Sequence, residues 1–193
     1  HYHYFEDGGA TYHSRYNTWQ FIRGQEGDPC IGQVKDPTCP PSVCRTVQTD
    51  KWTRQDWVNR SFMRREADQP QPQTFGAGLD FIRRNAEQDQ WFLQIETFDP
   101  HEPFFSQRKY KDLYAEHYDR YRNAGGKHFD WPLYRAVQET PQEIEHLRFE
   151  YAALLAMCDA YLGEVLDTMD ELDLWKDTML IVWTDHGFFL GEK

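Results

Sequence analysis

Two polar stretches contain the side chains of this sequence that could do chemistry. Asp185 and His186 follow the apolar run TMLIVWT at 178–184, and His101 lies in the proline-rich stretch FDPHEPF at 98–104. A carboxylate beside an imidazole can bind a divalent cation. Asp-His-Gly taken alone is more often a capped strand end followed by a surface histidine. The pair therefore needs support from other residues.

A further pair of imidazoles stands at the start of the sequence. His1 and His3 are two residues apart, and on an extended segment this spacing points both rings to one face. Converging imidazoles with an aspartate suit a metal-assisted hydrolase better than a serine hydrolase, because the sequence has no Gly-x-Ser-x-Gly elbow. It also has no phosphate-binding loop and no dinucleotide-binding glycine pattern.

Strands are expected to position the two polar stretches. Residues 90–97 and 178–184 are apolar without clear alternation, which is typical of strands buried on both faces of a parallel sheet. The carboxyl ends of parallel strands lie at the same edge of the sheet. We therefore expect His101 and the Asp185–His186 pair to converge at that edge.

Helices are expected on either side of this sheet. Apolar spacing predicts an amphipathic helix over 75–89, and a shorter one is expected near 50–65. Thr140-Pro-Gln-Glu143 has a capping threonine, a proline in the first turn and a glutamate at the box position. A long helix should follow it to about Leu172. This order of elements predicts an α/β fold with a mostly parallel sheet flanked by helices.

The remaining segments are predicted to be irregular. Residues 1–29 are rich in aromatic side chains that suit a pocket wall, 30–74 read as a peripheral insertion, and 105–140 show no clear period. The 193 residues fit one domain or part of a larger one, and the start and end suggest an incomplete view of a longer protein. Cys30, Cys39 and Cys44 share one loop, where a disulfide and free thiols are both open.

Charge and hydropathy limit the partners. The net charge of −11 argues against a nucleic-acid surface, which needs clustered lysine and arginine. An anionic small substrate stays possible, since a bound metal reverses the local field. No apolar run is long enough to span a bilayer, and no signal-peptide pattern is present, so we expect no membrane partner.

The ordered set of motifs resembles the sulfatases of the alkaline-phosphatase-like superfamily. The resemblance is carried by Asp185-His-Gly187 after an apolar run, by the preceding helix MCDAYLG at 157–163, and by FDPHEPF at 98–104. The stretch YHYFEDGG at 2–9 is similar to a subgroup of bacterial sulfatases. The resemblance implies that residues 1–193 are part of one sulfatase-type catalytic domain with an α/β/α sandwich fold, and that 30–74 are an insertion in it.

The resemblance also implies roles for individual residues. Asp185 and His186 would bind a divalent cation, most often Ca²⁺. His101 would hydrogen-bond the sulfate or the leaving-group oxygen as a general acid. His1 and His3 would contact the nucleophile and the sulfate, and His1 departs from the lysine usual there. The substrate would be a small sulfated ester, of a sugar or of an aryl or alkyl alcohol.

Two parts of the family's site have no counterpart in this sequence. The aspartate pair that completes the metal site is absent, and so is the Cys- or Ser-x-Pro-x-Arg segment that supplies the formylglycine nucleophile. The resemblance therefore implies that both come from outside these 193 residues, and that the fragment alone is inactive. A phosphodiesterase or phosphonate monoester hydrolase of the same superfamily, and a non-catalytic protein of the same fold, remain alternatives. The compartment is open between the cytoplasm and the periplasm or exterior of a bacterium.

Overall fold

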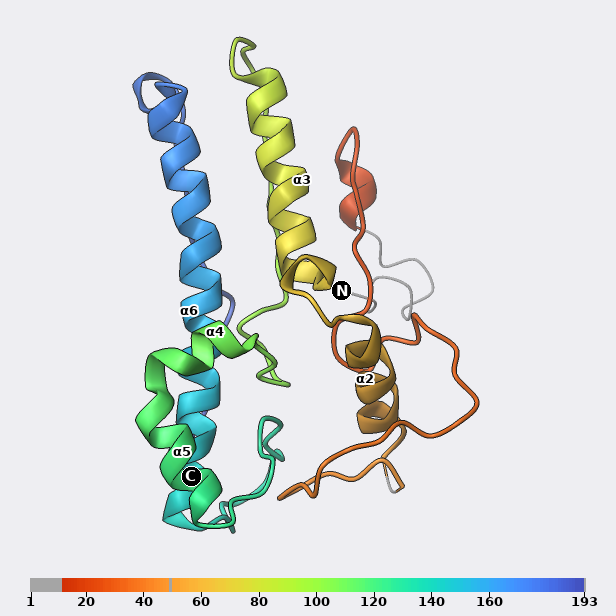
Figure 1. The fold of residues 1–193 in the computed structure, drawn as a ribbon. Helices are drawn as coiled ribbons and strands as arrows, with labels where there is room; N and C mark the ends of the chain where they lie inside the picture. The colour runs from red at the N-terminus through yellow and green to blue at the C-terminus, as the bar shows by residue number, and fades with distance from the viewer. Residues whose placement is uncertain (1–11, 49, 193) are drawn as a thin grey trace. The chain divides into compact units, whose positions relative to one another are not determined.

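The computed structural model describes residues 12–48 and 50–192 and divides the chain into two compact units. One unit holds the residues up to Pro41 together with Arg45–Gly78 and Leu93–Phe98. The other holds Ser42–Cys44, Leu79–Phe92 and the residues from Asp99 onwards. Figure 1 gives the course of the chain and its helices. Both predicted site turns lie in the second unit.

The first unit contains mostly short helices. In chain order these are η1 (Tyr12–Arg15), α2 (Lys51–Phe62), η2 (Glu66–Asp68) and most of α3 (Pro70–Asn85). The predicted helix near 50–65 is confirmed as α2, which begins after Asp50 because the Asp50 carboxylate accepts from the backbone N–H of Trp52 at 3.0 Å. The helix predicted over 75–89 is confirmed in part as α3, which begins and ends several residues earlier.

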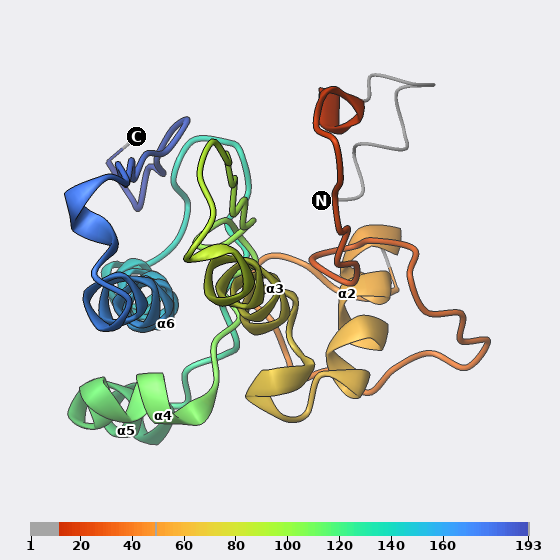
Figure 2. The ribbon, with the colours of Figure 1, turned by 90° about the horizontal axis from the view of Figure 1, so that it is seen from above.

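The second unit is organised on one long helix, α6 (Pro141–Glu171). The predicted capping box is present: the Thr140 hydroxyl accepts from the Glu143 N–H at 3.3 Å, and the Glu143 carboxylate accepts from the Thr140 N–H at 2.8 Å. The prediction of this helix is therefore confirmed. Figures 1 and 2 show its first half beside two shorter helices. These are α4 (Arg108–Lys111) and α5 (Ala115–Asn123), joined by η3 (Asp112–Tyr114), and η4 (Leu174–Lys176) follows α6.

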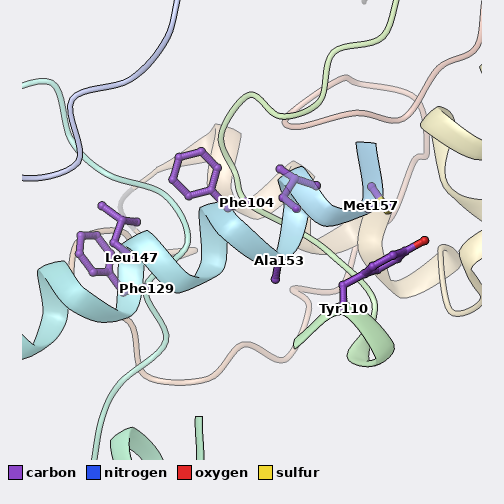
Figure 3. Packing of buried hydrophobic residues seen from close by; sticks show 7 residues of the cluster. Phe104, Tyr110, Phe129, Leu147, Ala153 and Met157 are labelled. Carbon is purple, nitrogen blue, oxygen red and sulfur yellow. The ribbon is translucent and has the colours of Figure 1, made fainter. Parts of the chain in front are cut away.

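The core of the second unit forms around α6. Figure 3 shows its buried side chains, which come from the helix itself, from α4 and from the segments near residues 104 and 129. The apolar spacing of α6 explains most of this burial, since Leu147 and Leu154 are buried, although the neighbouring Leu155 is exposed. The cluster consists of Phe104, Tyr110, Phe129, Leu147, Ala153, Leu154 and Met157.

The predicted parallel sheet is wrong. Residues 90–97 and 178–184 contain no strand, and within the described parts of the chain the β pairing consists of one isolated bridge between Ser42 and His128. A strand needs a neighbour for its backbone N–H and C=O groups, and neither segment has one in this structure. Accordingly the apolar run is not buried: Trp183 is 76% exposed. The prediction that 105–140 are irregular is also wrong, because they contain α4, η3 and α5.

Candidate active site

His101 lies in a tight turn that is fixed to the core of the second unit. The turn ends at Phe104, whose side chain is fully buried and whose N–H donates to the carbonyl oxygen of Asp130 at 2.8 Å. The side chain of Glu102 is also buried, and His101 itself is about one quarter exposed. The turn therefore presents an imidazole at the surface from a rigid base.

The His101 ring is held through its Nδ1 atom. Nδ1 lies 2.8 Å from the carbonyl oxygen of Glu102 and 3.1 Å from its carboxylate Oε2. The approach to the carbonyl has hydrogen-bond geometry, whereas that to Oε2 is an ion-pair contact without such alignment. Both neighbours accept hydrogen bonds, so Nδ1 carries a proton and the ring turns its Nε2 edge away from the Glu102 backbone.

The Asp185–His186 turn is much more open. The Asp185 side chain is 82% exposed and that of His186 is 56% exposed. Local contacts shape the turn: the His186 N–H donates to the Asp185 carboxylate at 2.9 Å, and the Thr184 hydroxyl donates to the His186 carbonyl at 2.9 Å. His186 Nδ1 lies 3.1 Å from the Gly187 carbonyl oxygen. The Nε2 atom therefore acts as the lone-pair nitrogen of this ring.

One aromatic side chain joins the two turns. The rings of His101 and His186 lie 6.1 Å apart, and Phe188 packs edge-on against both, at 5.3 Å and 5.8 Å between centroids. Phe188 also contacts Phe104 of the core at 5.5 Å. The two histidines that the sequence places 85 positions apart are thus neighbours, although no sheet edge brings them together.

The Asp185–His186 pair has the chemistry of two cation ligands. Asp185 Oδ2 and His186 Nε2 are 3.9 Å apart, and two donors bound to one Ca²⁺ are separated by about 3–4 Å. A ligating histidine commonly donates its other N–H to a carbonyl, as the contact between His186 Nδ1 and Gly187 does. The two residues fit a cation as part of a ligand set. Residues 12–48 and 50–192 contain no group of three or more such side chains able to hold a metal.

Comparison with known proteins decides the family of this chain. Residues 36–193 match the sequence model of the family described as Sulfatase. The chain belongs to the sulfatase family. The earlier recognition from FDPHEPF and Asp-His-Gly is thereby confirmed.

Several curated sulfatase relatives are similar to the chain at modest identity. Arylsulfatase K of Mus musculus is 26% identical over 95% of this chain, and a protein named Sulfatase from Formosa agariphila is 27% identical over 73%. The multifunctional alkaline phosphatase superfamily protein PehA of Trinickia caryophylli is 27% identical over 53%. The chain covers 33%, 30% and 24% of the lengths of these three relatives, respectively. No solved structure matches the chain.

The remaining predicted residues of this sulfatase chain can be placed only in part. His1 and His3 lie outside the described residues. Cys30, Cys39 and Cys44 form no disulfide, which answers the question left open for them. Burial raises the pKa of the Cys44 thiol to about 12, so this cysteine is protonated at neutral pH and unsuited to be a nucleophile. None of the helices in the described parts of the chain is both long and apolar enough to cross a membrane.

A second histidine cluster, which no sequence pattern indicated, lies between α5 and α6. His117 Nε2 lies 3.2 Å from His146 Nδ1, and the Tyr121 ring stacks on His146 at 3.8 Å. His146 Nε2 lies 3.5 Å from Glu150, which also binds Lys111 at 2.5 Å. Burial, with a smaller contribution from the positive charge of Lys111, lowers the pKa of His146 to about 3. These imidazoles are neutral and pack as core rings.

The site also contains residues to which the sequence reasoning gave no role. Glu102 stood inside the quoted FDPHEPF stretch, but a glutamate between prolines gives no sign of burial. Tyr134 donates its hydroxyl hydrogen bond to Glu102 from 32 residues further along the chain. Phe188 follows Asp-His-Gly directly in the sequence, and this position next to the motif was the signal that could have indicated its role.

Proposed function

We propose that the full-length protein is a sulfuric ester hydrolase that acts on a small sulfated ester of a sugar, aryl or alkyl alcohol. What supports this is the proximity of His101 and the Asp185–His186 pair, at 6.1 Å between imidazole centroids, in a chain that belongs to the sulfatase family. Mouse arylsulfatase K, which aligns with 95% of the chain, carries the name of such an activity.

In this proposal Asp185 and His186 bind a divalent cation, which is Ca²⁺ as the resemblance to sulfatases implies. Ligands from outside these 193 residues complete the site. When bound, the cation supplies positive charge against the sulfate oxygens and the nucleophile. The nucleophile is a formylglycine, also supplied from outside these 193 residues. Both groups are part of the proposal, and their positions are left unassigned.

The chain's own residues then handle the leaving group and the sulfate. In this step His101 acts as the imidazolium: its Nδ1–H is directed at Glu102, and its Nε2–H is donated to the oxygen of the departing alcohol, which leaves the ring neutral. Phe188 packs against both imidazoles and keeps water from the side of the site that faces the core. His1 and His3 are proposed to contact the sulfate and the nucleophile.

The proposal is tested by replacing His101 with alanine in the full-length protein and measuring kcat/KM on alkyl sulfates, whose alkoxide leaving group needs a proton. Loss of a general acid should lower kcat/KM by about 10²–10⁴-fold. His128→Ala is the matched control, because it removes an imidazole of the same unit that bonds Asp130 rather than the site. An unchanged kcat/KM for His101→Ala would remove His101 from the mechanism.

A phosphate ester is the second candidate substrate, because a member of the alkaline phosphatase superfamily is 27% identical over 53% of the chain. The same enzyme preparation should be assayed with a sulfate monoester and a phosphate diester of the same alcohol. We expect the larger kcat/KM on the sulfate. A larger value on the diester would replace the sulfatase assignment with that of a phosphodiesterase.

A further inference from the structure

Glu102 is a buried carboxylate for which the proposed chemistry has so far given no purpose. Its side chain is 2% exposed, in a turn between two prolines. Burying a carboxylate costs several kcal/mol unless partners stabilise its charge. Its ion-pair partner is His101, and the hydroxyl of Tyr134 donates to its Oε1 atom. Burial of the Glu102 carboxylate therefore costs free energy that packing of the loop alone would not require, which points to a further role for this residue.

The two carboxylate oxygens of Glu102 face different partners. Oε1 is occupied by the Tyr134 hydroxyl, which leaves Oε2 facing His101 Nδ1 at 3.1 Å. The backbone carbonyl of Glu102 accepts from the same Nδ1 at 2.8 Å. One residue thus places two acceptors against one ring nitrogen. A proton on Nδ1 is favoured, and the orientation of the ring is fixed.

We infer that Glu102, oriented by Tyr134, is the positioning residue of His101. The inference rests on the proposed function, in which His101 donates from Nε2 to the leaving oxygen. Because Nδ1 is already protonated, a ring that also donates from Nε2 carries a positive charge, and the Glu102 carboxylate stabilises this charge. The same logic applies wherever a buried carboxylate orients a catalytic histidine.

The first test compares leaving groups in the full-length protein. Glu102→Gln removes the charge and keeps the shape of the side chain. It should lower kcat on an alkyl sulfate by roughly 10–100-fold with little change in KM, whereas kcat on 4-nitrophenyl sulfate, whose phenolate leaves without protonation, should fall less than about threefold. Tyr134→Phe should show the same preference at a smaller size. An equal loss on both substrates, or no loss, would overturn the inference.

His101→Ala in the same assays separates the inference from the proposed function. If this variant loses alkyl sulfate turnover and Glu102→Gln does not, the positioning role fails and the proposed function stands. If His101→Ala changes turnover of neither substrate, the general-acid role of His101 fails and the positioning role of Glu102 fails with it. If the wild-type protein hydrolyses neither sulfate ester, the proposed function itself fails.

A second readout is independent of activity. In the ¹⁵N spectrum of ¹⁵N-histidine-labelled protein at one neutral pH, His101 should be protonated at Nδ1 in the wild type. In Glu102→Gln, His101 should become a mixture of the two tautomers. In Tyr134→Phe, which alters an exposed ring, the shift in the tautomer of His101 should be smaller. A His101 tautomer that is the same in all three proteins would overturn the inference, even if Glu102→Gln folds poorly in the kinetic assays.

Discussion

The two turns that meet at the candidate site are built in opposite ways. The His101 turn is enclosed: Glu102 and Phe104 are buried, and His101 Nδ1 hydrogen-bonds the Glu102 carbonyl and lies 3.1 Å from the Glu102 carboxylate. The Asp185–His186 turn is open, and its contact with the core runs through Phe188. One imidazole is thus held by the fold, while the other is presented to solvent with a neighbouring carboxylate.

This difference matches the chemistry proposed for each turn. A group that donates a proton must be held in one orientation, which burial and two acceptors provide for His101. A cation ligand must be reachable by an ion and by ligands from elsewhere, which an open turn allows for Asp185. We therefore expect substitutions in the enclosed turn to change stability, and substitutions in the open turn to leave it unchanged.

The largest effect is expected from Phe104→Ala. Phe104 is fully buried between Tyr151 and Phe188, so its removal leaves a cavity under the His101 turn. The free energy of unfolding, measured by urea denaturation, should fall by about 3–5 kcal/mol. Phe189→Ala is the control from the open turn, where the ring is largely exposed and the change should stay within about 0.5 kcal/mol. Similar decreases in the free energy of unfolding for both substitutions would show that the two turns do not differ in their contribution to stability.

The sequence predicted those features whose determinants are local. The capping box at Thr140 and the apolar spacing of α6 lie within one segment, so this helix could be placed to within a residue or two. The helices α4 and α5 were missed because their inward side chains are Tyr110 and His117, which do not form an apolar stripe.

The parallel sheet was predicted wrongly because strand pairing is not local. The composition of 178–184 favours a strand, but a strand forms only where another segment supplies hydrogen-bond partners. For the same reason, some residues of the site were predicted from the sequence and others were not. His101, Asp185 and His186 stand in recognisable motifs, whereas the contact between Tyr134 and Glu102 joins residues 32 positions apart.

A smaller effect, and one that depends on pH, is expected from the enclosed histidine His146. Its pKa in the folded protein is about 3, mainly because of burial, against about 6.5 in the unfolded chain. The unfolded state therefore binds more protons below pH 6.5, and the free energy of unfolding falls as pH falls through this window. From His146 the loss should be about 2 kcal/mol between pH 7 and pH 5.

The variant His146→Gln isolates this contribution. Glu150 has a raised pKa because it is buried, and its stabilising effect has the opposite sign, since it is lost as pH rises. Urea denaturation at pH 7 and pH 5 should therefore be run on both proteins. The wild type should lose more stability than the variant over this range. An equal loss in both would mean that His146 does not govern the acid sensitivity of the α5–α6 contact.

The smallest effect on stability is expected from Asp185→Asn in the open turn. Its side chain is 82% exposed, so the free energy of unfolding should change by less than about 0.5 kcal/mol. The affinity of the full-length protein for Ca²⁺, measured by calorimetric titration, should nevertheless fall by at least about 10-fold, because an anionic oxygen ligand becomes a neutral amide.

Asp177→Asn is the matched control, since it removes the same charge from an exposed position at the other end of the 178–184 segment. It should leave both stability and Ca²⁺ affinity unchanged. If both variants weaken Ca²⁺ binding equally, the ion responds to the general negative charge of the chain and Asp185 is not a ligand. If Asp185→Asn lowers stability with no change in affinity, the open turn has a structural role and its contrast with the enclosed His101 turn has been misread.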